Sequence, residues 1–201
     1  SLQSANHCPR SAQECLESMF QSLASSPSSR TSRQAGEAAS TLARNLRALS
    51  SGNRELADRL QSIQSATVEF EQAADGLWTG AYQGIRLCSR YQPGKEGTRL
   101  VEQVDVIEKP VVVVLGFGMG HHVRQLADRV GRDGLIVIHE PDLAMLRSVL
   151  ETVDCSAWIR STNCVFCWDH EDRTHVMETL HSFNPLLVQG VHLLEHPPSR
   201  Q

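Results

Sequence analysis

The chain has 201 residues, of which 40% are hydrophobic and 21% are charged, and its formal net charge is −4 at pH 7. This composition is that of an ordinary globular protein long enough to bury a core, and the negative charge argues against nonspecific binding of nucleic acid. No apolar run approaches the roughly 20 residues that a membrane-spanning helix needs, and the N-terminus lacks the basic-then-apolar order of a signal peptide, so we expect a cytoplasmic protein.

The first predicted element is an amphipathic helix over residues 11–24. Ser11 and Glu14 have the spacing of a capping box, in which hydroxyl and carboxylate satisfy free backbone donors. The apolar face carries Cys15, Leu16, Met19, Phe20 and Leu23. Packing against the rest of the chain, self-association into a homo-oligomer and binding to another partner all remain open for this face. The Ser-rich segment 25–33 predicts a linker, so residues 1–34 form an N-terminal helix and linker.

Residues 35–105 predict a subdomain of helices followed by a small antiparallel β-meander. The helical spacing over 35–63 breaks at residues 50–53, which read Ser-Ser-Gly-Asn. Between 66 and 89 the apolar period shortens to that of strands, and three glycines punctuate the stretch. Pro93 then has the position typical of the first residue of a helix.

Residues 106–201 predict a Rossmann-like α/β unit with a mostly parallel sheet and helices on both faces. The apolar run Val111–Leu115 leads into a glycine turn and a helix over 123–130. A second strand over 135–138 runs into Glu140, and a third over 164–168 is followed by Asp169. Helices over 142–150 and 171–182 and a last strand over 186–194 complete the alternation.

The predicted binding site lies where the parallel strands end, because open α/β sheets bind ligands at that edge. The candidate cofactor-binding residues are Gly116, Gly118, Gly120, His121, Glu140 and Asp169. His121 stands where the dinucleotide fingerprint requires a third glycine, which weakens NAD or FAD as the ligand. The closer analogue is the turn of S-adenosylmethionine-dependent methyltransferases, so a nucleotide or S-adenosylmethionine is the expected ligand. A tight turn that serves packing alone fits the glycines equally well.

Cysteine usage predicts reduced thiols and no metal site. Cys164 and Cys167, followed by His170 and His175, supply the residue types of a zinc site. However, residues 164–168 read as a strand, in which positions three apart point to opposite faces.

Three motifs in order resemble a known family. They are Leu87–Glu96, the glycine turn with His121 and His122, and Ile138–Asp142. Together they resemble the N-terminal region of Maf (motility accessory factor) proteins, which are bacterial flagellin glycosyltransferases, and of the related 6-hydroxymethylpterin pyrophosphokinase MptE-like proteins. The resemblance covers residues 40–195; here Gly97 replaces the family's Ala and His121 its Tyr. It adds Ser89, Tyr91, His122 and Asp142 as further candidate cleft residues, although Asp142 also fits a helix N-cap.

The resemblance implies an accessory role for this chain. Family members continue into a larger domain with a Gly-Pro-Ser-Leu-type loop, and this sequence contains no Gly-Pro-Ser. We therefore expect a fragment that is not catalytic alone, with no catalytic residue assigned. Its partners would be the C-terminal catalytic domain of a glycosyltransferase-type parent and a protein acceptor such as flagellin. The alternative from the residues alone is a methyltransferase-like nucleotide-binding domain.

Overall fold

The computed structural model describes residues 27–168, 180–181 and 183–200. The chain divides into two units, residues 1–37 and 38–201, and apart from the start of the first helix all elements below belong to the second unit. The predicted helix over 11–24, most of the predicted helix over 171–182, and Asp169 lie outside the described residues.

Two helices open the described chain, α2 (Pro27–Leu49) and α3 (Arg54–Ser62). The predicted break at residues 50–53 is confirmed. The linker predicted over 25–33 is wrong from Pro27 onward, because the chain there is already helical. Proline is well suited to the first position of a helix, and serine disfavours a helix by only about 0.5 kcal/mol per residue, so composition alone misjudged this stretch.

A small antiparallel sheet follows, as the alternating pattern predicted. Its strands are β1 (Glu69–Gln72), β2 (Trp78–Tyr82) and β3 (Ile85–Arg86), in that order. Gln83 and Gly84 connect β2 to β3 with φ angles of 51° and 79°, the positive values that a tight hairpin turn requires. Helix α4 (Pro93–Glu102) begins at the predicted proline.

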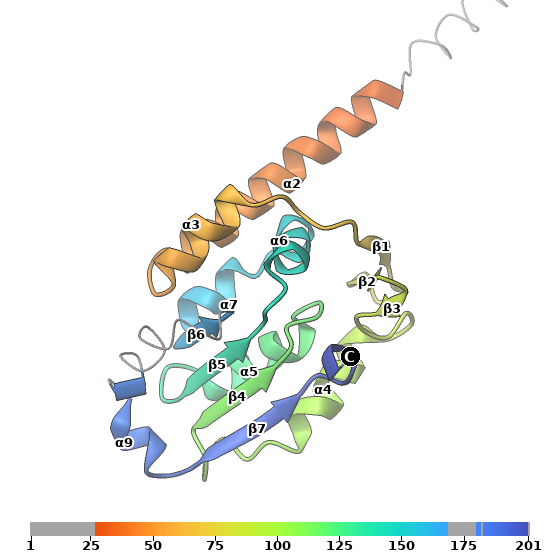
Figure 1. Cartoon of the computed structure of the whole chain (residues 1–201). Helices are drawn as coiled ribbons and strands as arrows, with labels where there is room; N and C mark the ends of the chain where they lie inside the picture. Colours follow the sequence, from red (N-terminus) through yellow and green to blue (C-terminus); the bar gives the residue numbers. More distant parts are fainter. Residues whose placement is uncertain (1–26, 169–179, 182, 201) are drawn as a thin grey trace, which may run out of the picture. The chain divides into compact units, whose positions relative to one another are not determined.

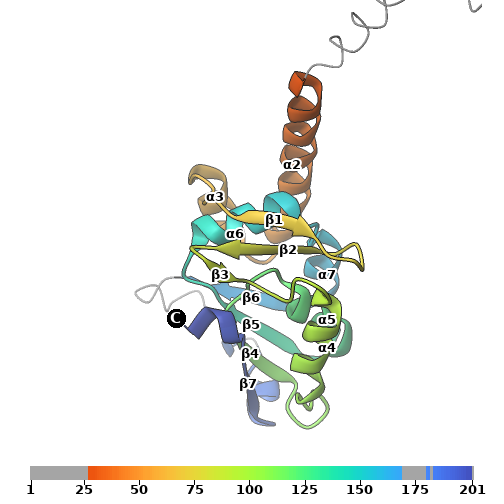
Figure 2. The ribbon, with the colours of Figure 1, turned by 90° about the vertical axis from the view of Figure 1, so that its right-hand side faces the viewer.

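The second sheet is parallel and has the order β6-β5-β4-β7 (Figure 1). Its strands are β4 (Val111–Leu115), β5 (Leu135–His139), β6 (Cys164–Cys167) and β7 (Val191–Glu195). Strands β4 and β5 pair in register from Val111 with Leu135 to Leu115 with His139. The Rossmann-like α/β fold is thus confirmed. The small antiparallel sheet lies toward the carboxyl ends of the parallel strands (Figures 1 and 2).

Alternate residues of the parallel strands enter two separate apolar clusters. One face packs with α5 (His121–Val130), α6 (Leu143–Thr152) and α7 (Ser156–Ser161), and it holds the main core. The other face packs with Leu180, Phe183 and the short helix α9 (Asn184–Leu187). The last strand was predicted from Leu186, but it begins at Val191. An apolar run of this length fits a helix and a strand alike, and Pro185 favours the helix start.

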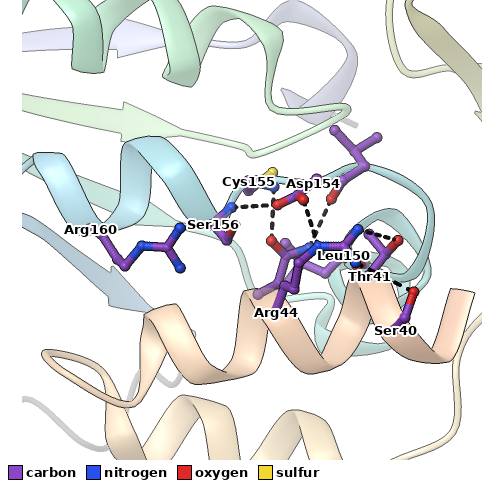
Figure 3. A network of polar contacts seen from close by, with 10 residues as sticks. Ser40, Thr41, Arg44, Leu150, Asp154, Cys155, Ser156 and Arg160 are labelled. Carbon is purple, nitrogen blue, oxygen red and sulfur yellow. Dashed lines mark hydrogen bonds and ion pairs between the residues drawn. The ribbon is translucent and has the colours of Figure 1, made fainter. Parts of the chain in front are cut away.

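Helix α2 is joined to the segment between α6 and α7 by a buried amide. Asn45 has no exposed surface; its Nδ2 group donates to the carbonyl oxygens of Leu150 and Val153 at 2.7 and 2.8 Å, and its Oδ1 accepts from the Cys155 N–H at 2.8 Å. Beside it, Arg44 forms an ion pair with Asp154 at 2.7 Å (Figure 3). Exposed ion pairs of this kind contribute at most about 1 kcal/mol, so the buried amide is the stronger connection.

A second buried amide closes one edge of the parallel sheet. Asn53, between α2 and α3, is 3% exposed and lies against β6. Its Nδ2 group donates to the Cys164 carbonyl oxygen and its Oδ1 accepts from the Phe166 N–H, each at 2.9 Å. The side chain therefore makes the two hydrogen bonds that a neighbouring strand would make.

No helix among the described residues is long and apolar enough to cross a membrane.

Candidate functional site

The predicted glycine turn connects β4 to α5 and requires glycine at three positions. Gly116, Gly118 and Gly120 have φ angles of 92°, 50° and 75°. Residues with a side chain rarely adopt such angles. Three of them at alternate positions allow the chain to reverse within a few residues. The Gly116 N–H donates to the His139 carbonyl oxygen at 2.9 Å, so the turn begins while the β4–β5 ladder is still intact.

Glu140 faces this turn, as the sequence predicted, but its carboxylate is engaged by the backbone. One oxygen accepts from the Phe117 N–H at 2.9 Å and the other from the Asp142 N–H at 3.0 Å. Only 4% of the residue is exposed. Burial raises the pKa of this carboxyl, and the two backbone hydrogen bonds oppose that rise. The acid therefore fixes the shape of the turn.

His121 and His122 are both buried at the start of α5, with 8% and 3% of their surface exposed. The His121 Nε2–H donates to the Trp78 carbonyl oxygen on β2 at 2.7 Å, which attaches the antiparallel sheet to the rim. The His122 Nε2–H donates to the Gly116 carbonyl oxygen at 3.1 Å. Burial lowers the pKa of both imidazoles, that of His122 to about 3. Both rings are therefore neutral at pH 7.

Two residues that the sequence did not single out lie against the glycines of the turn. They are His196, directly after β7, and Ser199 in the 3-10 helix η1 (Pro197–Arg200). A Cβ atom built on Gly118 would lie 2.3 Å from the His196 Cε1 atom, and one built on Gly116 would lie 2.1 Å from the Ser199 Oγ atom. The sequence offered one indication of this role, and only for His196: it follows a parallel strand, at the sheet edge where the other site residues were expected.

His196 is held by several contacts at once. Its ring stacks on the His122 ring with centroids 4.7 Å apart and planes 5° apart. Its Nδ1 atom lies 2.8 Å from the Ser199 Oγ atom, and the ring also hydrogen-bonds the backbone of Leu87. Burial lowers the pKa of His196 to about 4.

The cavity that the described residues line at this rim is too small for a nucleotide. A cavity of about 10 Å³ remains, and its lining includes Glu96, His121, His122 and His196. That volume accommodates about one water molecule, whereas small-molecule sites occupy roughly 300–1,000 Å³.

The remaining candidates have structural partners or lie apart. Asp142 caps α6, as one reading predicted: one oxygen accepts from the Met145 N–H and the other from the Tyr82 hydroxyl, each at 2.9 Å. The Ser89 hydroxyl accepts from backbone N–H groups within its own loop. Tyr91 is 74% exposed, so it faces solvent. Asp169 lies outside the described residues.

A larger cavity, about 260 Å³, opens near the amino ends of β5 and β6. It lies where α2, α5 and α7 end, and the carboxyl ends of helices carry partial negative charge. Arg132 donates to the Arg160 carbonyl oxygen there at 3.1 Å. Arg132 therefore lies at the carboxyl end of α7, while Arg160 donates to the Ser156 hydroxyl of the same helix at 3.4 Å.

Among the described residues, no group of three or more His, Cys, Asp or Glu side chains is arranged to hold a metal ion. Burial raises the pKa of the Cys164 thiol to about 12 and that of Cys167 to about 11. Such thiols carry almost no thiolate at neutral pH and are poor nucleophiles.

These observations define a Rossmann-like α/β domain whose glycine turn is occupied by its own side chains. The fold is similar to that of a Maf glycosyltransferase from Magnetospirillum magneticum AMB-1, with a TM-score of 0.52 and 18% sequence identity. The match covers 79% of this chain and 32% of that chain, so this chain spans about a third of that protein's length. No protein-family model and no curated protein matches the sequence. The likeness confirms the fold that the sequence resemblance implied.

Proposed function

We propose that this chain is a Rossmann-like accessory domain of a Maf-like, glycosyltransferase-related protein and is not catalytic by itself. The observation that carries the proposal is the occupied glycine turn. In nucleotide-binding relatives of this fold, the backbone of that turn approaches a phosphate, and here His196 and Ser199 occupy that space.

The proposed role is to support or orient a separate catalytic domain, or to engage the protein acceptor, for which flagellin is the candidate. Two independent lines support the Maf assignment: the order of three sequence motifs and the shared fold. A cytoplasmic location and the catalytic domain of a longer parent protein as partner belong to the same proposal.

A transfer assay tests the lack of catalysis. The isolated chain is incubated with flagellin and a sugar donor, CMP-activated nonulosonic acid, and glycosylated flagellin is measured by intact mass. We expect no product, and measurable turnover would contradict the proposal. The assignment to a Maf-like parent is tested separately, by reading the gene beyond Gln201 for a Gly-Pro-Ser-Leu segment.

No observation among the described residues favours the methyltransferase alternative. It would need Glu140 to accept ribose hydroxyls, but both of its oxygens already accept backbone N–H groups. Calorimetry with S-adenosylmethionine and S-adenosylhomocysteine is the direct check. Binding at or below millimolar ligand would revive that alternative.

A further inference from the structure

The segment after β7 is attached to the glycine turn by a few identifiable contacts. The His196 N–H donates to the Leu115 carbonyl oxygen at 2.9 Å, and the Ser199 N–H donates to the His196 carbonyl oxygen at 3.0 Å. The Ser199 side chain also lies against Gly116. The His196 ring supplies further contacts: its stack on His122, its hydrogen bond with Ser199 and its backbone hydrogen bond with Leu87. One imidazole therefore joins η1 to α5 and to the loop before α4.

The stacked rings are sensitive to charge because both are buried. A proton on either ring would place a cation against the other ring, with 3% of each residue exposed to water. His121 on α5 adds a third imidazole, and Cys88 adds a thiol whose pKa is raised by burial.

The acids near the stacked rings would do little to stabilise a positive charge on them. Glu96 on α4 already accepts from the Ser89 N–H, and Glu140 already accepts from the Phe117 and Asp142 N–H groups. In agreement with this geometry, burial lowers the pKa of His122 to about 3 and that of His196 to about 4.

We propose that residues 196–200 form an acid-released latch over the glycine turn. Protonation of the stacked His122–His196 pair detaches the latch and uncovers Gly116 and Gly118, while the parallel sheet remains folded. This conformational device does not depend on the proposed function.

The pH window follows from the sign of the shifts. Both imidazoles are held neutral in the closed state, with pKa values below the ordinary 6.5, and both reach water when the latch opens. Opening is therefore favoured as the pH falls below 6.5. The population of the open form rises by about tenfold per pH unit for each imidazole released, until the closed-state pKa of about 4 is reached for His196 and about 3 for His122.

Amide hydrogen exchange between pH 7 and pH 5, corrected for the intrinsic rate, tests the latch in this chain. We expect the His196 and Ser199 amides to lose protection steeply as the pH is lowered. The Ile136 amide of β5, which donates to the Asn163 carbonyl oxygen at 2.9 Å, should keep its protection. Protection that stays constant at His196, or that falls equally at Ile136, would overturn the proposal.

Two variants separate the stack from other histidines. His196→Phe keeps an aromatic ring against His122 but cannot be protonated, so the dependence of log protection on pH should fall by about half. His192→Gln removes a histidine from β7, outside the stack, and should behave as wild type. Equal loss of the pH dependence in both variants would refute the latch.

Imidazole NMR of the wild type gives a reading that does not depend on how a variant folds. The rings of His122 and His196 should take up protons only as the Ser199 amide loses protection. Protonated rings in a chain with a fully protected Ser199 amide would also overturn the proposal.

Discussion

The His196 ring occupies the space that a side chain at position 118 would need, since its Cε1 atom lies 2.3 Å from the place of a Cβ atom on Gly118. The glycine thus makes room for another part of the same protein. A glycine pattern that in related folds admits a ligand admits an imidazole here.

Gly118→Ala should destabilise the domain by about 2–4 kcal/mol, because it combines a positive φ angle with a collision against His196. Urea unfolding at pH 7 measures the loss. Gly52→Ala is the matched control, since nothing lies within 4 Å of a Cβ atom there, and it should stay within about 0.5 kcal/mol of wild type. A Gly118→Ala domain as stable as this control would show that His196 yields freely.

Glu140→Gln should destabilise the domain by about 1–3 kcal/mol, because an amide NH₂ replaces one of two oxygens that accept buried N–H groups. Burial raises the pKa of Glu140 above its usual value of 4.5. The folded state therefore binds its proton more tightly than the unfolded state, and the carboxyl's contribution declines as the pH rises through the raised pKa.

The stability difference between wild type and Glu140→Gln should accordingly narrow from pH 5 to pH 8, as measured by urea unfolding. Glu69→Gln makes the same change at an exposed position on β1 and should cost little at any of these pH values. A difference that widens with pH would contradict the raised pKa.

Cys155, Cys164 and Cys167 should resist alkylation in the folded chain at pH 7.5. Burial raises the pKa of Cys155 and Cys164 to about 12 and that of Cys167 to about 11, so the reactive thiolate is scarce. Iodoacetamide labelling followed by peptide mass spectrometry should find these sites modified only in urea. Rapid modification of folded Cys155 would count against its burial.

Asn53→Asp should cost about 3 kcal/mol, because a carboxylate oxygen would replace the amide that donates to the Cys164 carbonyl oxygen. Thermal or urea unfolding measures the effect. Gln61→Glu makes the same chemical change on the exposed side of α3 and should cost less than about 1 kcal/mol. Equal effects of the two substitutions would mean that Asn53 does not hold the β6 edge.

The sequence predicted the parts of the site that depend on local geometry. Positive φ angles require glycine at 116, 118 and 120, and strand order brings Glu140 to the same rim. The position of His196 could not be predicted, because it depends on the turn that the chain makes after a strand far along the sequence. Local patterns carry no information on which side chain fills a space opened by distant glycines.

The same limit explains two wrong assignments in the fold. The apolar residues before Val191 suit helix α9 as well as a strand, and the Ser-rich start of α2 suits a helix when proline opens it. In both places the competing structures differ by only a few tenths of a kcal/mol per residue, which tertiary contacts easily exceed.

Because of the Asn53 amide, the two edges of the parallel sheet differ: the β6 edge is partly hydrogen-bonded, and the β7 edge is open among the described residues. At β6 the central N–H and carbonyl groups are already paired, whereas β7 has no strand on its outer side among the described residues. In the parallel sheet, as far as the described residues show, β7 is therefore the edge better able to accept another strand. If two copies pair through β7, the outer edges of the joined sheet are the two β6 strands. Because Asn53 caps each β6 edge, we expect such an assembly to stop at a dimer and not to grow into a fibre.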